Sequence, residues 1–183
     1  MTTREEILLL GEKLIRLKGY NAFSYHDISA ALDIKNAAVH YHFPKKTDLA
    51  VAILQSCHER SVKILEKNKY DNALDKLKAF LKVYADNYKH SMVCLVGGMA
   101  AEFHSFEAPV QKELKTVVQY ITERLADILE EGRKQKVFEF KETPRTKALL
   151  VVTNMIAALQ LERIMGKKEF TDIYQAVIKD SAA

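Results

Sequence analysis

The sequence contains little glycine and proline, only two cysteines and no tryptophan. Its 183 residues include six Gly and three Pro, fewer than a turn-rich β protein needs. Two of the prolines, Pro44 and Pro144, stand where a helix could begin. We therefore expect an all-α fold. Cys57 and Cys94 form no CxxC pair, so we expect both to remain thiols, without a structural disulfide.

Two further absences concern membranes and export. The longest unbroken apolar runs, such as Ala148–Val152, fall far short of the roughly 20 residues that a membrane-spanning helix needs. The N-terminal segment Met1–Glu6 is polar and acidic and lacks the basic and hydrophobic parts of a secretory signal. With 48% apolar and 28% charged residues, the composition is that of an ordinary globular protein. We expect a cytoplasmic protein without a membrane partner.

Positive charge is unevenly distributed along the chain. The formal net charge of +4 is mild and does not by itself indicate a nucleic-acid-binding protein. Residues 35–46, however, contain three lysines and two histidines without an acid, whereas Glu130, Glu131, Glu139 and Glu142 lie in the C-terminal half. The N-terminal end is therefore the positive one.

Apolar residues recur at spacings of three and four over most of the chain, which predicts helices. Capping-box spacings at Thr2–Glu5 and Ser24–Asp27, and Pro144 after Thr143, mark three of the expected helix starts. No strand, repeat or low-complexity linker is expected. The nine expected helices run from Thr2 or Thr3 to Lys18, Ser24 to Leu32, Lys35 to Phe43, Lys46 to about Glu66, Asp71 or Asn72 to Tyr88, through a short apolar segment interrupted at Gly97–Gly98 and ending near Phe106, Pro109 to Gly132, Thr143 to Met165, and Phe170 to Ile178.

The second and third expected helices, joined by a turn at Asp33–Ile34, have the lengths of a helix-turn-helix. Val39 and Phe43 would face inward on the third helix. The residues left toward solvent would be Asn36, Ala37, His40 and Tyr41.

Residues 35–49, which read KNAAVHYHFPKKTDL, resemble the end of the DNA-binding domain of the TetR (tetracycline-repressor) family, where an aromatic-rich LYxHF-x-x-K-x-x-L pattern follows the recognition helix. The resemblance extends over about residues 3–55, including Gly19–Tyr20 and the helix at 27–32. The positions that occupy the signature are Val39, His40, Tyr41, His42, Phe43, Lys46 and Leu49.

The resemblance implies a nine-helix TetR-like fold with two parts. Residues 1–46 would be a three-helix DNA-binding domain, and residues 47–183 a helical bundle for ligand binding and dimerisation. It further implies a homodimeric transcription regulator that binds a palindromic operator in double-stranded DNA and is released by a small, largely apolar effector. Repression is the expected output, and activation is the alternative. Such a protein is not an enzyme, and no cofactor is expected.

The chemistry of the recognition helix agrees with this interpretation. Asn36 could bond the edge of adenine, and small side chains such as Ala37 could contact a thymine methyl group. His40 replaces the family's usual aromatic residue and could titrate near neutral pH, although a neutral donor is the simpler alternative. Tyr41, His42 and Lys46 have donors suited to phosphate oxygens. The full set of expected DNA-binding residues is Ser24, Tyr25, Lys35, Asn36, Ala37, Ala38, His40, Tyr41, His42, Lys45 and Lys46.

Aromatic, sulfur-containing and polar-tipped residues of the later helices could line an effector pocket. The alternative is that they are ordinary core residues. We expect the long helix that begins at Lys46 to couple such a pocket to the DNA-binding heads. The expected effector-binding residues are Leu54, Cys57, Ser61, Leu65, Tyr84, Tyr88, Met99, Phe103 and Tyr120.

The helix from Ala148 to Met165 is apolar on nearly all sides and so requires cover on two of them. One side is expected to contact a second subunit, and burial at the centre of its own bundle is the alternative. The expected dimer residues on this helix and the next are Leu149, Val152, Ile156, Leu159, Arg163, Ile173, Tyr174 and Val177.

Three other functions remain as alternatives. An enzyme could assemble its site from distant residues, although the sequence has no recognisable catalytic motif. A metal or thiol sensor could use Cys57–His58 or the set His90, Cys94 and His104, but these lack the tight spacing of metal ligands, and no metal is expected. A structural protein could also bind DNA without any ligand, with steep salt dependence and no sequence preference.

Overall fold

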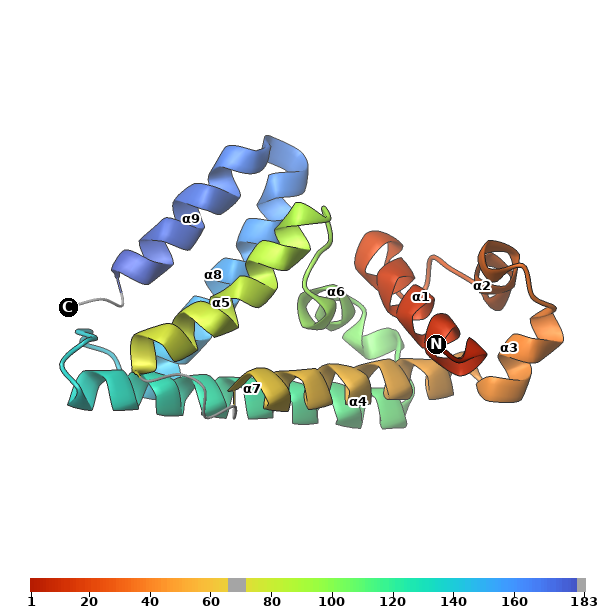
Figure 1. Ribbon diagram of the computed structural model, residues 1–183, viewed down its shortest axis with the longest axis horizontal. Helices are drawn as coiled ribbons and strands as arrows, with labels where there is room; N and C mark the ends of the chain where they lie inside the picture. Colours follow the sequence, from red (N-terminus) through yellow and green to blue (C-terminus); the bar gives the residue numbers. More distant parts are fainter. Residues whose placement is uncertain (66–71, 181–183) are drawn as a thin grey trace. The chain divides into compact units, whose positions relative to one another are not determined.

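The computed structural model describes residues 1–65 and 72–180, which form helices and connecting loops without a β-strand. Within this range there are nine α-helices and one short 3₁₀ helix, η1 (Figure 1). The all-α prediction is confirmed. The elements are α1 Thr3–Lys18, α2 Tyr25–Leu32, α3 Asn36–His42, α4 Lys46–Leu65, α5 Ala73–Lys89, α6 Leu95–Ala101, η1 Phe103–Ser105, α7 Ala108–Lys134, α8 Pro144–Met165 and α9 Lys167–Lys179.

Short polar side chains begin several of these helices by accepting an otherwise unpaired backbone N–H. Thr2 caps α1 in a capping box with Glu5, as its spacing predicts. Asn72 accepts the N–H of Asp75 at 2.9 Å and begins α5. The alternative cap, Asp71, and the expected end of the fourth helix at Glu66 lie outside the described residues. Thr143 caps α8 in the same way, with Pro144 in its first turn.

Two helices differ from their expected ranges. Gly97–Gly98 does not interrupt the sixth helix, because α6 continues through both glycines with Leu95 and Met99 buried. The burial offsets the cost of about 1 kcal/mol that glycine adds to a helix. Helix α9 begins at Lys167, three residues before the expected Phe170, because its polar first turn gives no apolar signal.

Helix α7 also continues beyond its expected end at Gly132 and reaches Lys134. Gly132 lies under the ring of Phe138, where an added Cβ would come within 2.0 Å of Cδ2. This glycine therefore serves the close approach of a ring and does not end the helix.

The chain divides into two compact units. Unit 1 contains residues 1–58 and 95–117, and unit 2 contains the described residues of 59–94 and 118–183. Unit 1 extends past the domain boundary expected between residues 46 and 47, since it continues to residue 58 and also contains residues 95–117. The functional division into a DNA-binding part and a ligand-binding part stays a prediction.

In unit 1, α1 packs against α2, α3 and α6. Gly11 allows α1 to approach α4 closely, since an added Cβ would lie 3.1 Å from the side chain of Leu49. The large side chains that are fully buried in this unit include Ile7, Ile15, Ile28, Leu49, Ile53, Leu54, Leu95 and Met99.

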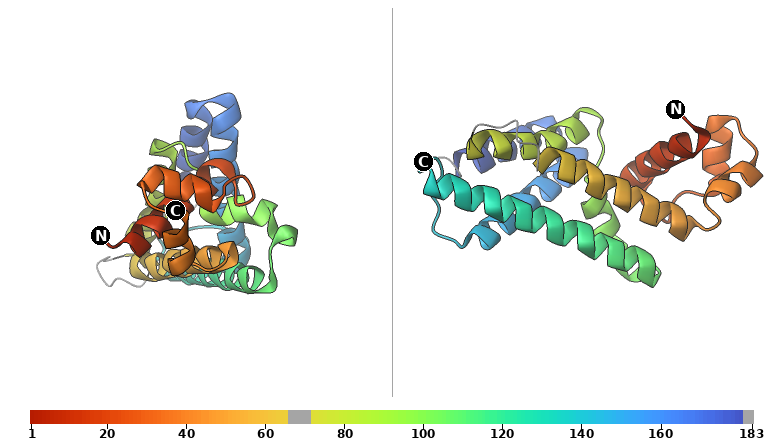
Figure 2. Two further views of the ribbon diagram at one scale, coloured as in Figure 1. Left: turned by 90° about the vertical axis from the view of Figure 1, so that its right-hand side faces the viewer. Right: turned by 60° about the horizontal axis from the view of Figure 1, so that its bottom comes forward.

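In unit 2, helices α5, α8 and α9 pack on the C-terminal part of α7. Helix α9 folds back beside α8 after Gly166, which has a φ of +116° that favours glycine (Figures 1 and 2). Tyr88 of α5 stacks on Phe170 of α9 with ring centroids 4.4 Å apart. The buried core contains Leu77, Leu81, Leu125, Leu129, Ala148, Val151, Met155, Ala158, Leu159, Phe170 and Val177.

Candidate DNA-binding surface

Helices α2 and α3 form the expected helix-turn-helix. A capping box begins α2: the N–H of Asp27 donates to Ser24 Oγ at 3.4 Å, and the N–H of Ser24 donates to Asp27 Oδ2 at 2.7 Å. Hydrogen bonds from Ser24 lower the pKa of Asp27. Helix α2 ends at Asp33 in a left-handed conformation with a φ of 52°, which aspartate tolerates better than most residues. The turn before α3 therefore needs no glycine.

The inner side of α3 holds it against the rest of unit 1. Val39 and Phe43 are almost completely buried, as the spacing predicts. The hydroxyl of Tyr25 donates a 2.8 Å hydrogen bond to the carbonyl oxygen of Phe43, directly after the helix. Burial raises the pKa of Tyr25, which favours the protonated hydroxyl that this bond requires. Tyr25 therefore joins α2 to the end of α3, and its expected contact with DNA stays a prediction.

The outer side of α3 consists of the four residues expected there, Asn36, Ala37, His40 and Tyr41, all of which are exposed. The Tyr41 side chain is 83% exposed. His40 Nδ1 lies 3.3 Å from the carbonyl oxygen of Pro44. Because a carbonyl can only accept, this contact requires a proton on Nδ1 and leaves Nε2 available to another partner.

Of the remaining expected DNA-binding residues, Ser24 and Lys35 are exposed, and Ala38 and His42 are half-buried. Lys35 occupies the N-cap position of α3 without a capping hydrogen bond from its side chain. Its ammonium group is therefore not used in starting the helix.

The two neighbouring lysines at the start of α4 have different environments. Lys45 is exposed, and its backbone N–H donates to Asp48 at 2.8 Å. Lys46 is half-buried, and its ammonium group donates to the carbonyl oxygens of Tyr20, at 2.5 Å, and Phe23. It also lies 4.5 and 4.1 Å from the ring centroids of these two residues. Desolvation lowers the pKa of Lys46.

The Lys46 ammonium group binds the backbone of its own chain, and its expected contact with a phosphate stays a prediction. Its donors are directed at the loop between α1 and α2, where two carbonyl groups and two aromatic rings compensate a desolvated cation. Lys45 is the lysine of this pair whose ammonium group is available to an external anion.

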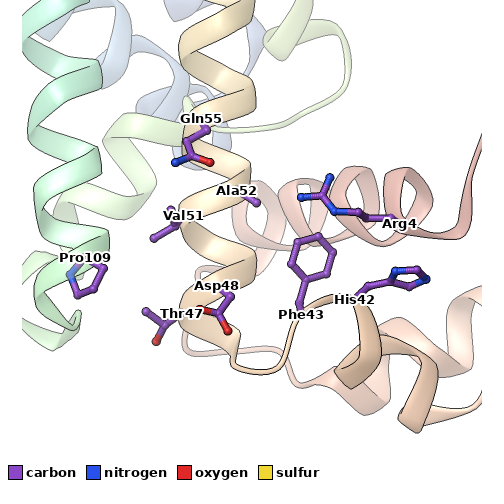
Figure 3. A pocket seen from close by; sticks show the side chains of 9 residues that line it. All are labelled: Arg4, His42, Phe43, Thr47, Asp48, Val51, Ala52, Gln55 and Pro109. Atoms are coloured by element: carbon purple, nitrogen blue, oxygen red, sulfur yellow. The ribbon is translucent and has the colours of Figure 1, made fainter.

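A further cation, missed in the sequence, stands beside the recognition helix. The guanidinium of Arg4 lies 5.0 Å from the centroid of the Phe43 ring. Arg4 and Phe43 line an open hollow of about 360 Å³ together with residues from α4 (Figure 3). The hollow contains none of the expected effector-binding residues. Its lining is Arg4, His42, Phe43, Thr47, Asp48, Val51, Ala52, Gln55 and Pro109.

The expected effector-binding residues are divided between the two units. Leu54, Cys57, Met99 and Phe103 belong to unit 1, and the other five belong to unit 2. Leu54 and Met99 are fully buried. The hydroxyl of Tyr88 donates to the carbonyl oxygen of Lys167 at 3.3 Å. The effector pocket stays a prediction.

The side of α8 that faces its own unit differs from our expectation. Leu159 of α8 and Val177 of α9, both expected at a dimer contact, are buried in the core of unit 2. Val152, Ile156, Ile173 and Tyr174 are half-buried against the same core. Leu149 and Arg163 are exposed, as a subunit contact requires. An apolar stripe continues along the exposed side through Leu150, Ala157, Leu161 and Ile164.

Helix α8 also has the length and composition of a membrane-spanning helix, and 33% of its most apolar segment is buried. The helix has no long unbroken apolar run, because Thr153 and Asn154 divide two shorter runs. One such helix is weak support for a membrane span, since the core helix of a soluble protein can have the same length and composition.

Metal-ligating residues are not gathered anywhere in the described ranges. No group of three or more His, Cys, Asp or Glu side chains in residues 1–65 and 72–180 could hold a metal ion. Cys57 and Cys94 are half-buried and form no disulfide.

The fold and the exposed recognition helix define the class of helix-turn-helix DNA-binding proteins. The model of the tetR family of bacterial regulatory proteins matches residues 7–53. The model of the tetracyclin repressor-like C-terminal domain matches residues 73–177. The chain belongs to the TetR family of transcriptional regulators, which are DNA-binding proteins and not enzymes, as the resemblance predicted.

Solved structures of related regulators agree with this assignment. The chain is 29% identical to a TetR transcriptional regulator from Legionella pneumophila, with a TM-score of 0.89, and the match covers 100% of this chain and 98% of that one. A TetR-family regulator from Agrobacterium tumefaciens is 26% identical, with a TM-score of 0.91 and coverage of 98% and 97%.

Two curated relatives are more distant. IcaR of Staphylococcus aureus, a negative transcriptional regulator of the icaADBC biofilm operon, is 20% identical over 118 residues, which are 63% of each chain. The chain therefore spans less than two thirds of that relative. The transcriptional repressor NemR of Escherichia coli K12 is 20% identical over 163 residues, 85% of this chain and 81% of NemR.

Proposed function

We propose that this protein is a cytoplasmic, ligand-responsive repressor that binds a palindromic operator as a homodimer. The observation that carries the proposal is the exposed face of α3, where short and hydrogen-bonding side chains stand opposite the buried Val39. A helix of this kind fits the major groove. The names of the relatives IcaR and NemR support repression over activation.

Base reading is assigned to the first turns of α3. Asn36 can form two hydrogen bonds with adenine, and Ala37 can contact a thymine methyl group. Tyr41 and Lys45 would bind phosphate oxygens, which position the protein without reading sequence. Arg4 joins this group, because its guanidinium is exposed beside the end of α3 and donates in a fork that suits phosphate.

The exposed stripe of α8 is assigned to the contact between subunits. Leu150, Ala157, Leu161 and Ile164 follow one another at spacings of seven, four and three residues, and so share one side of the helix. Three of them, Leu150, Leu161 and Ile164, are large hydrophobic side chains exposed to solvent in the single chain, with Ile164 at 82%. An isologous pair of α8 helices would cover them and place two recognition helices about one DNA turn, roughly 34–36 Å, or a multiple of it apart.

The effector is proposed to be a small, largely apolar molecule that lowers operator affinity. Coupling between two such sites is typically about 5- to 150-fold, and DNA must then weaken ligand binding by the same factor. A candidate compound that raises the melting temperature is titrated calorimetrically with and without operator DNA. Equal ligand affinities in the two titrations would exclude that compound as an inducer, since a ligand that binds both states equally shifts nothing.

Sequence-specific binding is tested by incubating the protein with genomic DNA fragments and sequencing those that are retained. The expected result is enrichment of a palindrome, which also locates the regulated genes. Asn36→Ala should relax the preference at one position in each half-site, and the exposed substitution Gln119→Ala on α7 is the matched control. Retention of fragments without a shared sequence would indicate nonspecific DNA binding instead.

A further inference from the structure

The loop between α1 and α2 is bound by a carboxylate that is distant in sequence. Glu102, between α6 and η1, accepts the backbone N–H of Tyr20 at 2.8 Å through Oε1 and that of Asn21 at 2.9 Å through Oε2. Both oxygens of one carboxylate therefore bind consecutive amide groups of the loop. Hydrogen bonds to a charged acceptor are about twice as strong as neutral ones.

Two neighbours of Glu102 bind the same loop residues. The side-chain amide of Asn21 donates to Ser105 Oγ at 3.0 Å, and this hydroxyl donates to the carbonyl oxygen of Glu102 at 2.8 Å. The ring of Phe106 meets the ring of Tyr20 edge to face, with centroids 5.1 Å apart. Residues 102–106 thus hold the loop through a carboxylate, a hydroxyl and an aromatic ring.

The loop has a backbone suited to this contact. Gly19 has a φ of +95°, and a Cβ added there would lie 2.7 Å from Glu102 Oε1. A side chain at this position would therefore meet the carboxylate and also strain the backbone. On another side, the ammonium group of Lys46 binds the carbonyl oxygens of Tyr20 and Phe23.

These contacts determine where the helix-turn-helix begins. The loop leads directly into Ser24, which caps α2, and α2 is tied to the end of α3 through Tyr25. A recognition helix reads bases only when its supporting residues hold it within a fraction of an ångström of the right position. Glu102 belongs to unit 1 with the DNA-binding helices, although it lies outside the matched DNA-binding region, residues 7–53.

We propose that Glu102 is a positioning residue for operator binding, which orders the α1–α2 loop and through it the recognition helix without touching DNA. This inference rests on the proposed function. It means that the DNA-binding unit is incomplete without residues 102–106.

The test uses the full chain and the variant Glu102→Gln, in which the side-chain amide group cannot accept both loop N–H groups. Glu113→Gln on α7 makes the same change of charge in the same unit and is the control. Amide hydrogen exchange of Tyr20 and Asn21 is expected to accelerate by about tenfold or more in Glu102→Gln alone, as loss of a charged hydrogen bond implies. Operator affinity should fall by a similar factor, while affinity for random DNA changes less than about twofold, since random binding depends on phosphate charge.

A loss of global fold would accelerate exchange throughout unit 1 and weaken binding to both DNAs. A loss of operator affinity without a similar loss for random DNA therefore indicates positioning and not folding. If Glu102→Gln does not fold, Ser105→Ala removes the Asn21 contact alone and should accelerate exchange at the loop by a smaller factor. Unchanged exchange at Tyr20 and Asn21, or wild-type operator affinity in Glu102→Gln, would overturn the proposal. Failure of the wild-type protein to prefer any operator would instead contradict the proposed function, and the exchange data would still decide whether Glu102 orders the loop.

Discussion

The hydroxyl of Tyr25 donates a 2.8 Å hydrogen bond to the carbonyl oxygen of Phe43 and so joins the first turn of α2 to the residue that ends α3. A recognition helix of seven residues has few hydrogen bonds of its own and depends on such contacts for its position. The bond also explains why an aromatic residue with a polar tip is buried at this place.

Tyr25→Phe is expected to destabilise the protein by about 1–3 kcal/mol, because it leaves the buried carbonyl group of Phe43 without this donor. Tyr41→Phe is the matched control, since its hydroxyl is on an 83% exposed side chain and its removal should leave stability within about 0.5 kcal/mol. Chemical denaturation measures both. At a temperature where both variants are folded, Tyr41→Phe should weaken DNA binding more than Tyr25→Phe does. Equal stability of the two variants would contradict the role of Tyr25 in joining α2 to α3.

Lys45→Ala and Lys46→Ala should have different effects despite their adjacent positions. Lys45→Ala is expected to leave the melting temperature unchanged and to flatten the slope of log affinity against log salt by about 0.9 for each phosphate that it no longer neutralises. Lys46→Ala should lower the melting temperature, because the carbonyl groups of Tyr20 and Phe23 lose their donor. Melting curves and salt titrations of both variants decide the matter. A flattened salt slope with unchanged stability in Lys46→Ala would instead show that Lys46 contacts a phosphate.

Leu161→Asp combined with Ile164→Asp should yield monomers, since each subunit would place two carboxylates in the proposed contact between α8 helices. Because both side chains are exposed in the single chain, the monomer should keep its helix content. The control is Gln119→Asp, an exposed substitution on α7. Sedimentation velocity and circular dichroism measure these properties. If the double variant still sediments as a dimer, the subunits meet at another surface.

Acidification should weaken the capping box of α2. The pKa of Asp27 is lowered by its bonds to Ser24, so its contribution to stability is present above the unfolded value of about 3.9 and is lost as pH falls through the lower folded value. Melting temperatures of the wild type and of Asp27→Asn, measured from pH 6 to pH 2.5, should therefore converge at the acidic end. Asp33→Asn, the same change at the residue that follows α2, is the control. A constant difference between the wild type and Asp27→Asn would contradict this account.

The sequence was sufficient to predict the exposed face of α3. Val39 and Phe43 form one buried stripe, so a short helix can face the core in only one orientation. The polar cap at Ser24 also marks the start of the neighbouring helix α2. Sequence periodicity could not orient α8, because a helix that is apolar on nearly all sides gives no preferred direction. In the structure Leu159 is buried, and the exposed side of α8 contains Leu161 instead.

Sequence reasoning also could not find the partners of single polar side chains. Lys46 stands in a family signature next to an exposed lysine, and only the fold shows that its ammonium group binds two loop carbonyl groups. Glu102 is 82 residues away from Tyr20, and no local pattern indicates that a carboxylate there binds loop amides. The glycine at position 19 could have suggested only a turn or a close approach there.

The central claim is that the exposed face of α3 reads a specific DNA sequence. Its most direct test is the affinity of the wild-type protein for the recovered palindrome and for a scrambled duplex of the same length and composition, measured by fluorescence anisotropy at fixed physiological salt. We expect the palindrome to bind about 10³-fold or more tightly than the scrambled duplex, and Asn36→Ala to reduce this ratio by about 5- to 150-fold. Equal affinities for the two duplexes in the wild-type protein would contradict this claim.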